Sequence, residues 1–243
     1  MKITFKNIIE DYLKTHDRIT TSEAFALFKQ HQPEIKKSTV NWRLYELVQR
    51  GVIRRAGRGL YVPGHKDDYQ PFISDEVKEL SQLIRSAFPL ITYSIWNTDQ
   101  IKGFSQHIPA VSYTIVDVEF EGVFAVIDKL KENHNHVYNG NSKSVLTEIL
   151  PDLKQAIVVK TLVSEAPILQ IDNIPSPSLE KILVDLFCDS GLFDYLHGHE
   201  LVHIYRNILN QYTVNITRLF RYAARRGKQN EIKLFMNQII GNK

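Results

Sequence analysis

The sequence predicts a mixed α/β (α+β) protein, with an N-terminal winged helix-turn-helix followed by a mixed-sheet domain that has a helical C-terminal part. Three patterns carry this prediction. Helical spacing of apolar residues covers residues 3–50, a two-strand pattern with a Gly-rich turn follows at 52–62, and runs rich in Ile, Val and Tyr alternate with helical patterns later. With 243 residues, 43% of them hydrophobic, the chain is long and apolar enough for one or two packed domains.

The first fifty residues predict three short helices. Apolar residues at helical spacing place the first helix over residues 3–14. Polar residues at 20–22 can cap a second helix, and Pro33 breaks the chain after it. Ser38 or Thr39 can cap a third helix that runs to about Arg50, and Gly51 ends it.

A two-stranded ribbon is predicted after the third helix. Residues 52–56 and 60–62 predict the strands, and Gly57-Arg58-Gly59 forms the turn between them. Three helices followed by such a ribbon is the element order of a winged helix-turn-helix. Because the segment 65–71 is polar and predicts a linker, we assign residues 1–65 to this domain and residues 66–243 to a second one.

The sequence of the second domain predicts a mixed sheet followed by a helical bundle. Residues 90–96, 112–118 and 156–163 predict strands, and residues 101–107 and 123–130 predict short helices. The bundle covers residues 176–243. Ser176 can cap its first helix with Pro177 in the first turn, and three more helices are predicted near 199–211, 213–226 and 228–240.

Charge is distributed unevenly along the chain. Residues 1–65 hold 12 Lys and Arg against 6 Asp and Glu, residues 66–212 hold 11 against 20, and residues 213–243 hold 7 against 1. The net charges are therefore +6, −9 and +6, which gives the overall +3. A basic block in a folded segment favours a polyanionic partner, most often nucleic acid, although a solvated charged face is the alternative.

Several function classes are excluded by composition. The single cysteine, Cys188, excludes an internal disulfide, a four-cysteine zinc cluster and a CxxC redox site, and it fits a buried inert thiol. The first twenty residues lack the apolar region of a secretory signal, and no uncharged apolar run approaches the ~18 residues of a membrane span. We therefore expect a cytoplasmic protein with no membrane partner, and no motif calls for a cofactor.

The third helix and the ribbon carry the residue types of a DNA reader. Small polar side chains near a helix N-terminus reach base edges, and neighbouring cations bind phosphates. The predicted DNA-binding residues are Lys36, Lys37, Ser38, Thr39, Asn41, Trp42, Arg43, Arg54, Arg55 and Arg58. Two alternatives stay open: the domain could dock a protein, and Trp42 could pack against the linker or a partner.

Two enzyme classes remain as alternatives. His199-Glu200-Leu201-Val202-His203 matches HExxH, in which the two His bind zinc and Glu200 acts as the base of a metallopeptidase, but no third ligand is evident. Asp152 and Lys154 resemble a fragment of a metal-dependent nuclease motif. That (Asp/Glu)-x-Lys spacing occurs four times in the chain, which makes the match weak.

The stretch STVNWRLYELVQRGVIRRAGRGLYVPG, at 38–64, resembles the N-terminal winged helix of AbiEi-like antitoxins of type IV, abortive-infection toxin–antitoxin systems. Residues 92–97 (TYSIWN) and the helix opening SPSLEKILVDLF at 176–187 are similar to two further family segments. The resemblance implies a non-enzymatic antitoxin that represses its own promoter at repeated sites and neutralises a nucleotidyltransferase toxin. A plain transcription regulator is the alternative.

Two groups of residues are candidates for contact with a partner. Lys181 and Asp185 lie in the third similar segment and are spaced i, i+4, so they form either part of a partner surface or a weak surface ion pair. Arg218, Arg221 and Arg225 fall on one face of a predicted helix in the basic C-terminal segment. They predict a second polyanion contact, or a solvated face balanced by the acidic middle of the chain.

Overall fold

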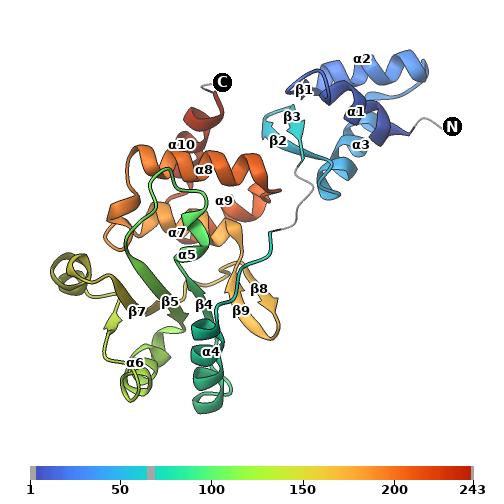
Figure 1. Cartoon of the computed structure of the whole chain (residues 1–243). Helices are drawn as coiled ribbons and strands as arrows, with labels where there is room; N and C mark the ends of the chain where they lie inside the picture. Colours follow the sequence, from blue (N-terminus) through green and yellow to red (C-terminus); the bar gives the residue numbers. More distant parts are fainter. Residues whose placement is uncertain (1–3, 65–68, 242–243) are drawn as a thin grey trace. The chain divides into compact units, whose positions relative to one another are not determined.

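The computed structural model describes residues 4–64 and 69–241, which belong to two compact units (Figure 1). The first unit is Met1–Tyr69 with Leu209–Ile216, and the second is Gln70–Ile208 with Thr217–Lys243. The architecture is mixed α/β, as the sequence predicts. Residue 3 of the predicted first helix and residues 65–68 of the predicted linker lie outside the described residues.

The first unit combines three helices with a small sheet. Its elements are α1 (Phe5–Leu13), β1 (Ile19–Thr20), α2 (Thr21–His31), α3 (Lys37–Gln49), β2 (Ile53–Gly57) and β3 (Leu60–Pro63). Strand β3 lies between β1 and β2 and is antiparallel to both. The buried core draws on every one of these elements: Ile9, Ile19, Ala24, Phe28, Ile35, Val40, Leu44, Leu47, Ile53 and Tyr61.

Local signals define the ends of α2 and α3. A capping box starts α2, because the Thr20 hydroxyl accepts from Glu23 N and the Glu23 carboxylate accepts from Thr20 N. Helix α3 starts at Lys37, so the prediction that Ser38 or Thr39 caps it is wrong; both lie inside its first turn. Gly51, at φ 68°, ends α3 in a Schellman motif, with Val52 N donating to Leu47 O at 3.0 Å.

The second unit is organised around a four-stranded sheet of order β4-β5-β7-β6. Strand β4 (Tyr93–Asn97) is antiparallel to β5 (Ser112–Val118), whereas β5, β7 (Gln155–Thr161) and β6 (Val137–Asn139) run parallel. Helices α4 (Asp75–Ala87), α5 (Asp99–Lys102) and α6 (Val123–Lys131) belong to this half, with short turns η1 (Phe120–Gly122), η2 (Val145–Ile149) and η3 (Leu150–Asp152). The helix predicted at 101–107 is thus shorter and begins earlier.

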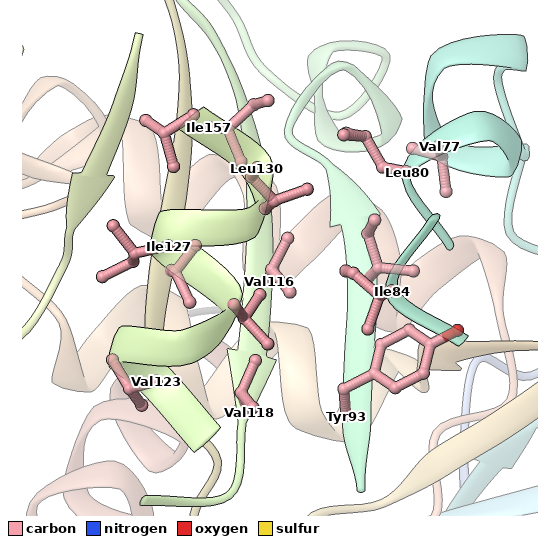
Figure 2. Close-up of a cluster of buried hydrophobic side chains, with 14 of the residues drawn as sticks. Val77, Leu80, Ile84, Tyr93, Val116, Val118, Val123, Ile127, Leu130 and Ile157 are labelled. Atoms are coloured by element: carbon pink, nitrogen blue, oxygen red, sulfur yellow. The ribbon is translucent and has the colours of Figure 1, made fainter. Parts of the chain in front are cut away.

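Helices α4 and α6 pack on one face of this sheet (Figure 2). Alternation along each strand directs one set of side chains into this layer and the other set to the opposite face. On β5, Val116 and Val118 face α4 and α6, whereas Asp117 faces the other way. The core on the α4 and α6 side includes Val77, Leu80, Ile84, Tyr93, Val116, Val118, Val123, Ile127, Leu130 and Ile157.

The chain then forms a hairpin and a helical layer. Strands β8 (Ile168–Ile171) and β9 (Ile174–Pro177) are joined by Asp172 and Asn173, both at positive φ, as a tight hairpin turn requires. Helices α7 (Leu179–Cys188), α8 (His199–Gln211), α9 (Ile216–Arg225) and α10 (Gln229–Gly241) follow, with the turn η4 (Asp194–Leu196). The prediction that Ser176 caps α7 is wrong, because Ser176 lies in β9 and Ser178 is the N-cap.

Helix α7 covers the second face of the sheet and is itself enclosed. All eight residues from Leu179 to Leu186 are buried. The Tyr205 hydroxyl of α8 donates to Leu183 O at 2.5 Å, and Trp96 of β4 lies 6.2 Å from the ring of Phe193. None of the described helices combines the length and the hydropathy that crossing a membrane requires.

Candidate functional site

The N-terminal half of α3 exposes the small polar residues that the sequence analysis selected. Lys36, Lys37, Ser38, Thr39 and Asn41 are all exposed, while Val40, between Thr39 and Asn41, is buried in the core. Within the described residues, the side chains of Lys36 and Lys37 make no ion pair or hydrogen bond. This half of α3 therefore presents unpaired cations beside polar groups.

The β2–β3 hairpin adds a second set of cations. Arg55 and Arg58 are exposed, and Arg58 follows the register shift that separates Arg55 from Gly57. Gly59 has φ 68°, a conformation that L side chains rarely adopt, and it closes the turn. Arg54 is half-buried on the other side of the strand, and burial lowers the pKa of its guanidinium.

Arg43 and Trp42 make contacts within their own unit. The Arg43 guanidinium carbon lies 4.9 Å from the centre of the Phe5 ring and 5.0 Å from that of Trp42, which is 55% exposed. Arg43 also pairs with Glu46 at 3.2 Å. Arg43 thus ties α3 to α1 and supports the exposed Trp42 ring from one side.

Lys181 and Asp185 are buried, which corrects the prediction of a surface pair on α7. Their exposed fractions are 0% and 2%, and Lys181 Nζ lies 2.5 Å from Asp185 Oδ2. The same ammonium contacts Asp117 Oδ2 of β5 at 2.6 Å. Neither side chain can touch an external partner in this structure, and both belong to a larger charged cluster.

The buried charge cluster joins β5, β7, α7 and the end of α9. Lys160 Nζ lies 2.7 Å from Asp117 Oδ1 and 3.1 Å from Asp189 Oδ2. Arg226 donates to Asp185 at 2.7 Å and to Asp189 at 2.5 Å, and the Tyr222 hydroxyl donates to Asp185 at 2.9 Å. Its six charged members are Asp117, Lys160, Lys181, Asp185, Asp189 and Arg226.

Three cations and three carboxylates make the cluster neutral as a whole. Burial alone would raise the pKa of Asp185, but Lys181, Lys160 and Arg226 outweigh burial and lower that pKa to about 2. Burial likewise acts to lower the pKa of Lys160, and three aspartates reverse this and raise it. Both shifts favour the charged forms of Asp185 and Lys160, so these two groups suit electrostatic binding rather than proton transfer.

A cavity of about 340 Å³ opens beside the cluster. Lys160, Asp189 and Arg226 line it together with Gly140, Asn141, Leu146, Thr161, Val163, Cys188, Ser190, Gly191 and Leu192. It lies at the carboxyl ends of the parallel strands β6 and β7, the edge at which open α/β sheets bind ligands. Burial raises the pKa of the Cys188 thiol to about 11, which disfavours the reactive thiolate.

Sequence analysis missed four members of the cluster. Asp117 and Lys160 are single charges inside otherwise uncharged strands, Ser112–Val118 and Gln155–Thr161, and that isolation is a signal that could have marked them. Asp189 and Arg226 carry no such signal. They meet only because the fold brings the ends of α7 and α9 together.

The HExxH residues lie at the start of α8. The Glu200 carboxylate accepts from Gln106 N at 2.5 Å and lies 3.4 Å from His107 Nδ1, so it fastens the loop after α5. His199 is exposed and His203 is half-buried. Over residues 4–64 and 69–241, no group of three or more His, Cys, Asp or Glu side chains could hold a metal ion.

The remaining candidates lie on the surface of the second unit. Asp152 ends η3 and Lys154 precedes β7, and both side chains are exposed. Arg218, Arg221 and Arg225 are exposed on α9, where Arg225 forms an ion pair with Glu165. The structure therefore places the three arginines on one helix face, beside but outside the buried cluster.

A family model described as "Family of unknown function (DUF6577)" matches residues 39–242. No curated protein matches the sequence. Because the match covers well over half of the chain, the chain belongs to this family.

Proposed function

We propose that this member of the DUF6577 family binds double-stranded DNA through its first unit and acts as a transcription regulator in the cytoplasm. The observation that carries the proposal is the exposed polar start of α3, from Lys36 to Trp42, in a unit whose hairpin exposes Arg55 and Arg58. The element order of this unit is the one that winged helices use.

Side-chain chemistry indicates which residues would contact bases and which would contact phosphates. An α-helix fits the major groove, where the Asn41 amide and the hydroxyls of Ser38 and Thr39 can meet base edges. Lys36, Lys37, Arg55 and Arg58 would bind phosphates, which supplies affinity but no sequence preference. Trp42 and Arg43 form a stacked pair that would flank the duplex.

Fluorescence anisotropy with DNA from the chain's own promoter tests this assignment. Lys37→Glu and Arg58→Glu should weaken binding to promoter DNA and to unrelated DNA alike, each by tenfold or more. Asn41→Ala should weaken binding to promoter DNA by about five- to 100-fold and leave unrelated DNA nearly unchanged.

Lys14→Glu is the matched control, because Lys14 is an exposed cation of the same unit that lies in neither α3 nor the hairpin. Equal losses for Lys14→Glu and Lys37→Glu would mean that net charge alone attracts the DNA. That result would contradict the proposed surface.

We further propose that the chain is an antitoxin that neutralises a nucleotidyltransferase toxin and represses its own promoter repeats. The support is the similarity of residues 38–64, 92–97 and 176–187 to AbiEi-like antitoxins. Because Lys181 and Asp185 are buried, the exposed arginines of α9 are the better candidates for toxin contact.

Growth after expression of the neighbouring open reading frame tests the antitoxin role. The neighbour alone should arrest growth, and the full chain should restore it. Arg221→Glu together with Arg218→Glu should reduce rescue, whereas Lys37→Glu should leave it intact. A harmless neighbour, or a chain that fails to rescue, would leave a plain transcription regulator as the function.

A further inference from the structure

The second unit has a cavity, lined by both charged and apolar residues, that the proposed DNA contact does not use. We propose that this cavity binds a small phosphate-bearing anion, with Lys160 and Arg226 as its cationic walls and Asp189 as an internal carboxylate that the ligand displaces. The inference is independent of DNA binding, because every residue involved belongs to the second unit.

The two cations retain donors that no described residue uses. An ammonium has three N–H bonds, and Lys160 Nζ forms ion pairs with Asp117 Oδ1 at 2.7 Å and with Asp189 Oδ2 at 3.1 Å. A guanidinium has five, and Arg226 directs three of them to Asp185 and Asp189. Lys160 and Arg226 both line the cavity, so the donors that remain are available to an oxyanion there.

The charge of the cavity wall favours an anion. Of the charged residues that line it, Lys160 and Arg226 are cations and Asp189 is the single carboxylate. Asp117, Asp185 and Lys181 lie behind the wall, where they hold the cations in place. This support fixes the positions of Lys160 and Arg226 and lowers the entropic cost of ligand binding.

Asp189 occupies the place of a ligand group. Its carboxylate contacts Lys160 at 3.1 Å and Arg226 at 2.5 Å, the arrangement expected of a bound oxyanion. It also lies at the C-cap of α7, where the helix dipole disfavours a negative charge. Since the Asp189 side chain is 20% exposed, it can turn outward when a phosphate takes over its two cations.

The cavity has room for more than the anion itself. At about 340 Å³, it falls within the size range of small-molecule sites. Thr161, Asn141 and Ser190 supply hydroxyl and amide groups along the wall. Leu146, Val163 and Leu192 line the same cavity, so the fit is to a phosphate monoester whose organic part has both hydroxyl and apolar groups.

Isothermal titration of the full chain with inorganic phosphate, at constant ionic strength set with chloride, tests the proposal. The wild type should bind one phosphate per chain in the millimolar range. Asp189→Asn, which removes the competing charge and keeps the shape, should bind phosphate about tenfold more tightly. Glu165→Gln is the matched control, because it removes the exposed carboxylate that pairs with Arg225, the neighbour of Arg226.

Saturable binding that tightens in Asp189→Asn and stays unchanged in Glu165→Gln supports the proposal. Absence of saturable binding, or equal changes in the two variants, overturns it. Should Asp189→Asn fail to fold, Ser190→Trp fills the cavity from an exposed lining position and keeps every cluster charge. Loss of phosphate binding in Ser190→Trp then supports the site, and unchanged binding overturns it.

Discussion

Replacement of Asp185 by Asn should destabilise the second unit strongly. The Asp185 carboxylate is 2% exposed and accepts from Lys181 at 2.5 Å, Arg226 at 2.7 Å and Tyr222 at 2.9 Å. The substitution keeps the shape and removes the charge. Lys181, which is fully buried, and Arg226, whose side chain is 12% exposed, then each lose a carboxylate.

Two routes give the size of this effect. Breaking a buried ion pair by removing one partner costs about 3–5 kcal/mol. The pKa of Asp185 falls from 3.8 to about 2 in the folded chain, which corresponds to about 2 kcal/mol in favour of the charged form. We therefore expect a loss of about 2–5 kcal/mol, and a fall in Tm of roughly 10 °C for a unit of this size.

Urea unfolding followed by tryptophan fluorescence measures this loss. A Trp42→Phe background leaves Trp96, which is 1% exposed on β4, as the reporter of the second unit. Glu165→Gln removes an exposed ion pair and should cost less than about 1 kcal/mol. Adding Lys181→Met to Asp185→Asn should restore part of the stability, because it removes the buried Lys181 charge that has lost Asp185 as a partner.

A loss below about 1 kcal/mol in Asp185→Asn would refute the reasoning. It would mean that water or another carboxylate replaces Asp185 as the partner of Lys181 and Arg226 with little loss in the free energy of unfolding. Equal losses in Asp185→Asn and Glu165→Gln would lead to the same conclusion.

Three further predictions follow from the two units. Because the pKa of Asp185 is lowered, its contribution is complete above about pH 4 and is lost as pH falls toward 2; the Tm of the Trp96 transition should fall across that range more in the wild type than in Asp185→Asn. Gly64→Ala would place a Cβ 1.7 Å from Gly51 O and should destabilise the first unit by about 1–3 kcal/mol, measured by circular dichroism. Gly57→Ala, in the same unit, would bring its Cβ no closer than 3.9 Å to Leu60 Cβ and should be neutral within about 0.5 kcal/mol. Burial raises the pKa of Cys188 to about 11, so iodoacetamide should alkylate the folded chain about 100-fold more slowly than the urea-unfolded chain; equal rates would contradict the burial.

Elements with a strong local pattern could be predicted from sequence. The strand Ser112–Val118 and the helix His199–Gln211 have the predicted bounds, because a run rich in Ile, Val and Tyr marks the first and helical spacing marks the second. Strand β6 has three residues, too few for any period, and was missed. The β8–β9 hairpin was also missed, although Asp172-Asn173 is a dipeptide that tight hairpin turns favour.

The charge cluster could be predicted only in part. The i, i+4 spacing of Lys181 and Asp185 marks them as a pair, and such a pair on a helix is usually exposed. Their burial depends on Asp117, 64 residues before Lys181, and on Arg226, 41 residues after Asp185. No local pattern encodes those separations, so sequence analysis placed the pair on the surface.

The salt dependence of DNA binding tests the central claim most directly. The affinity of the full chain for its promoter should fall linearly on a plot of log K against log salt, with a slope of about −3 to −4 if Lys36, Lys37, Arg55 and Arg58 each bind a phosphate. Replacing Arg55 and Arg58 by Ala should reduce the slope by about 1.8, while Lys14→Ala should leave it unchanged. No binding at low salt, or a slope that the Arg55 and Arg58 replacements do not alter, would contradict a DNA-binding role for this surface.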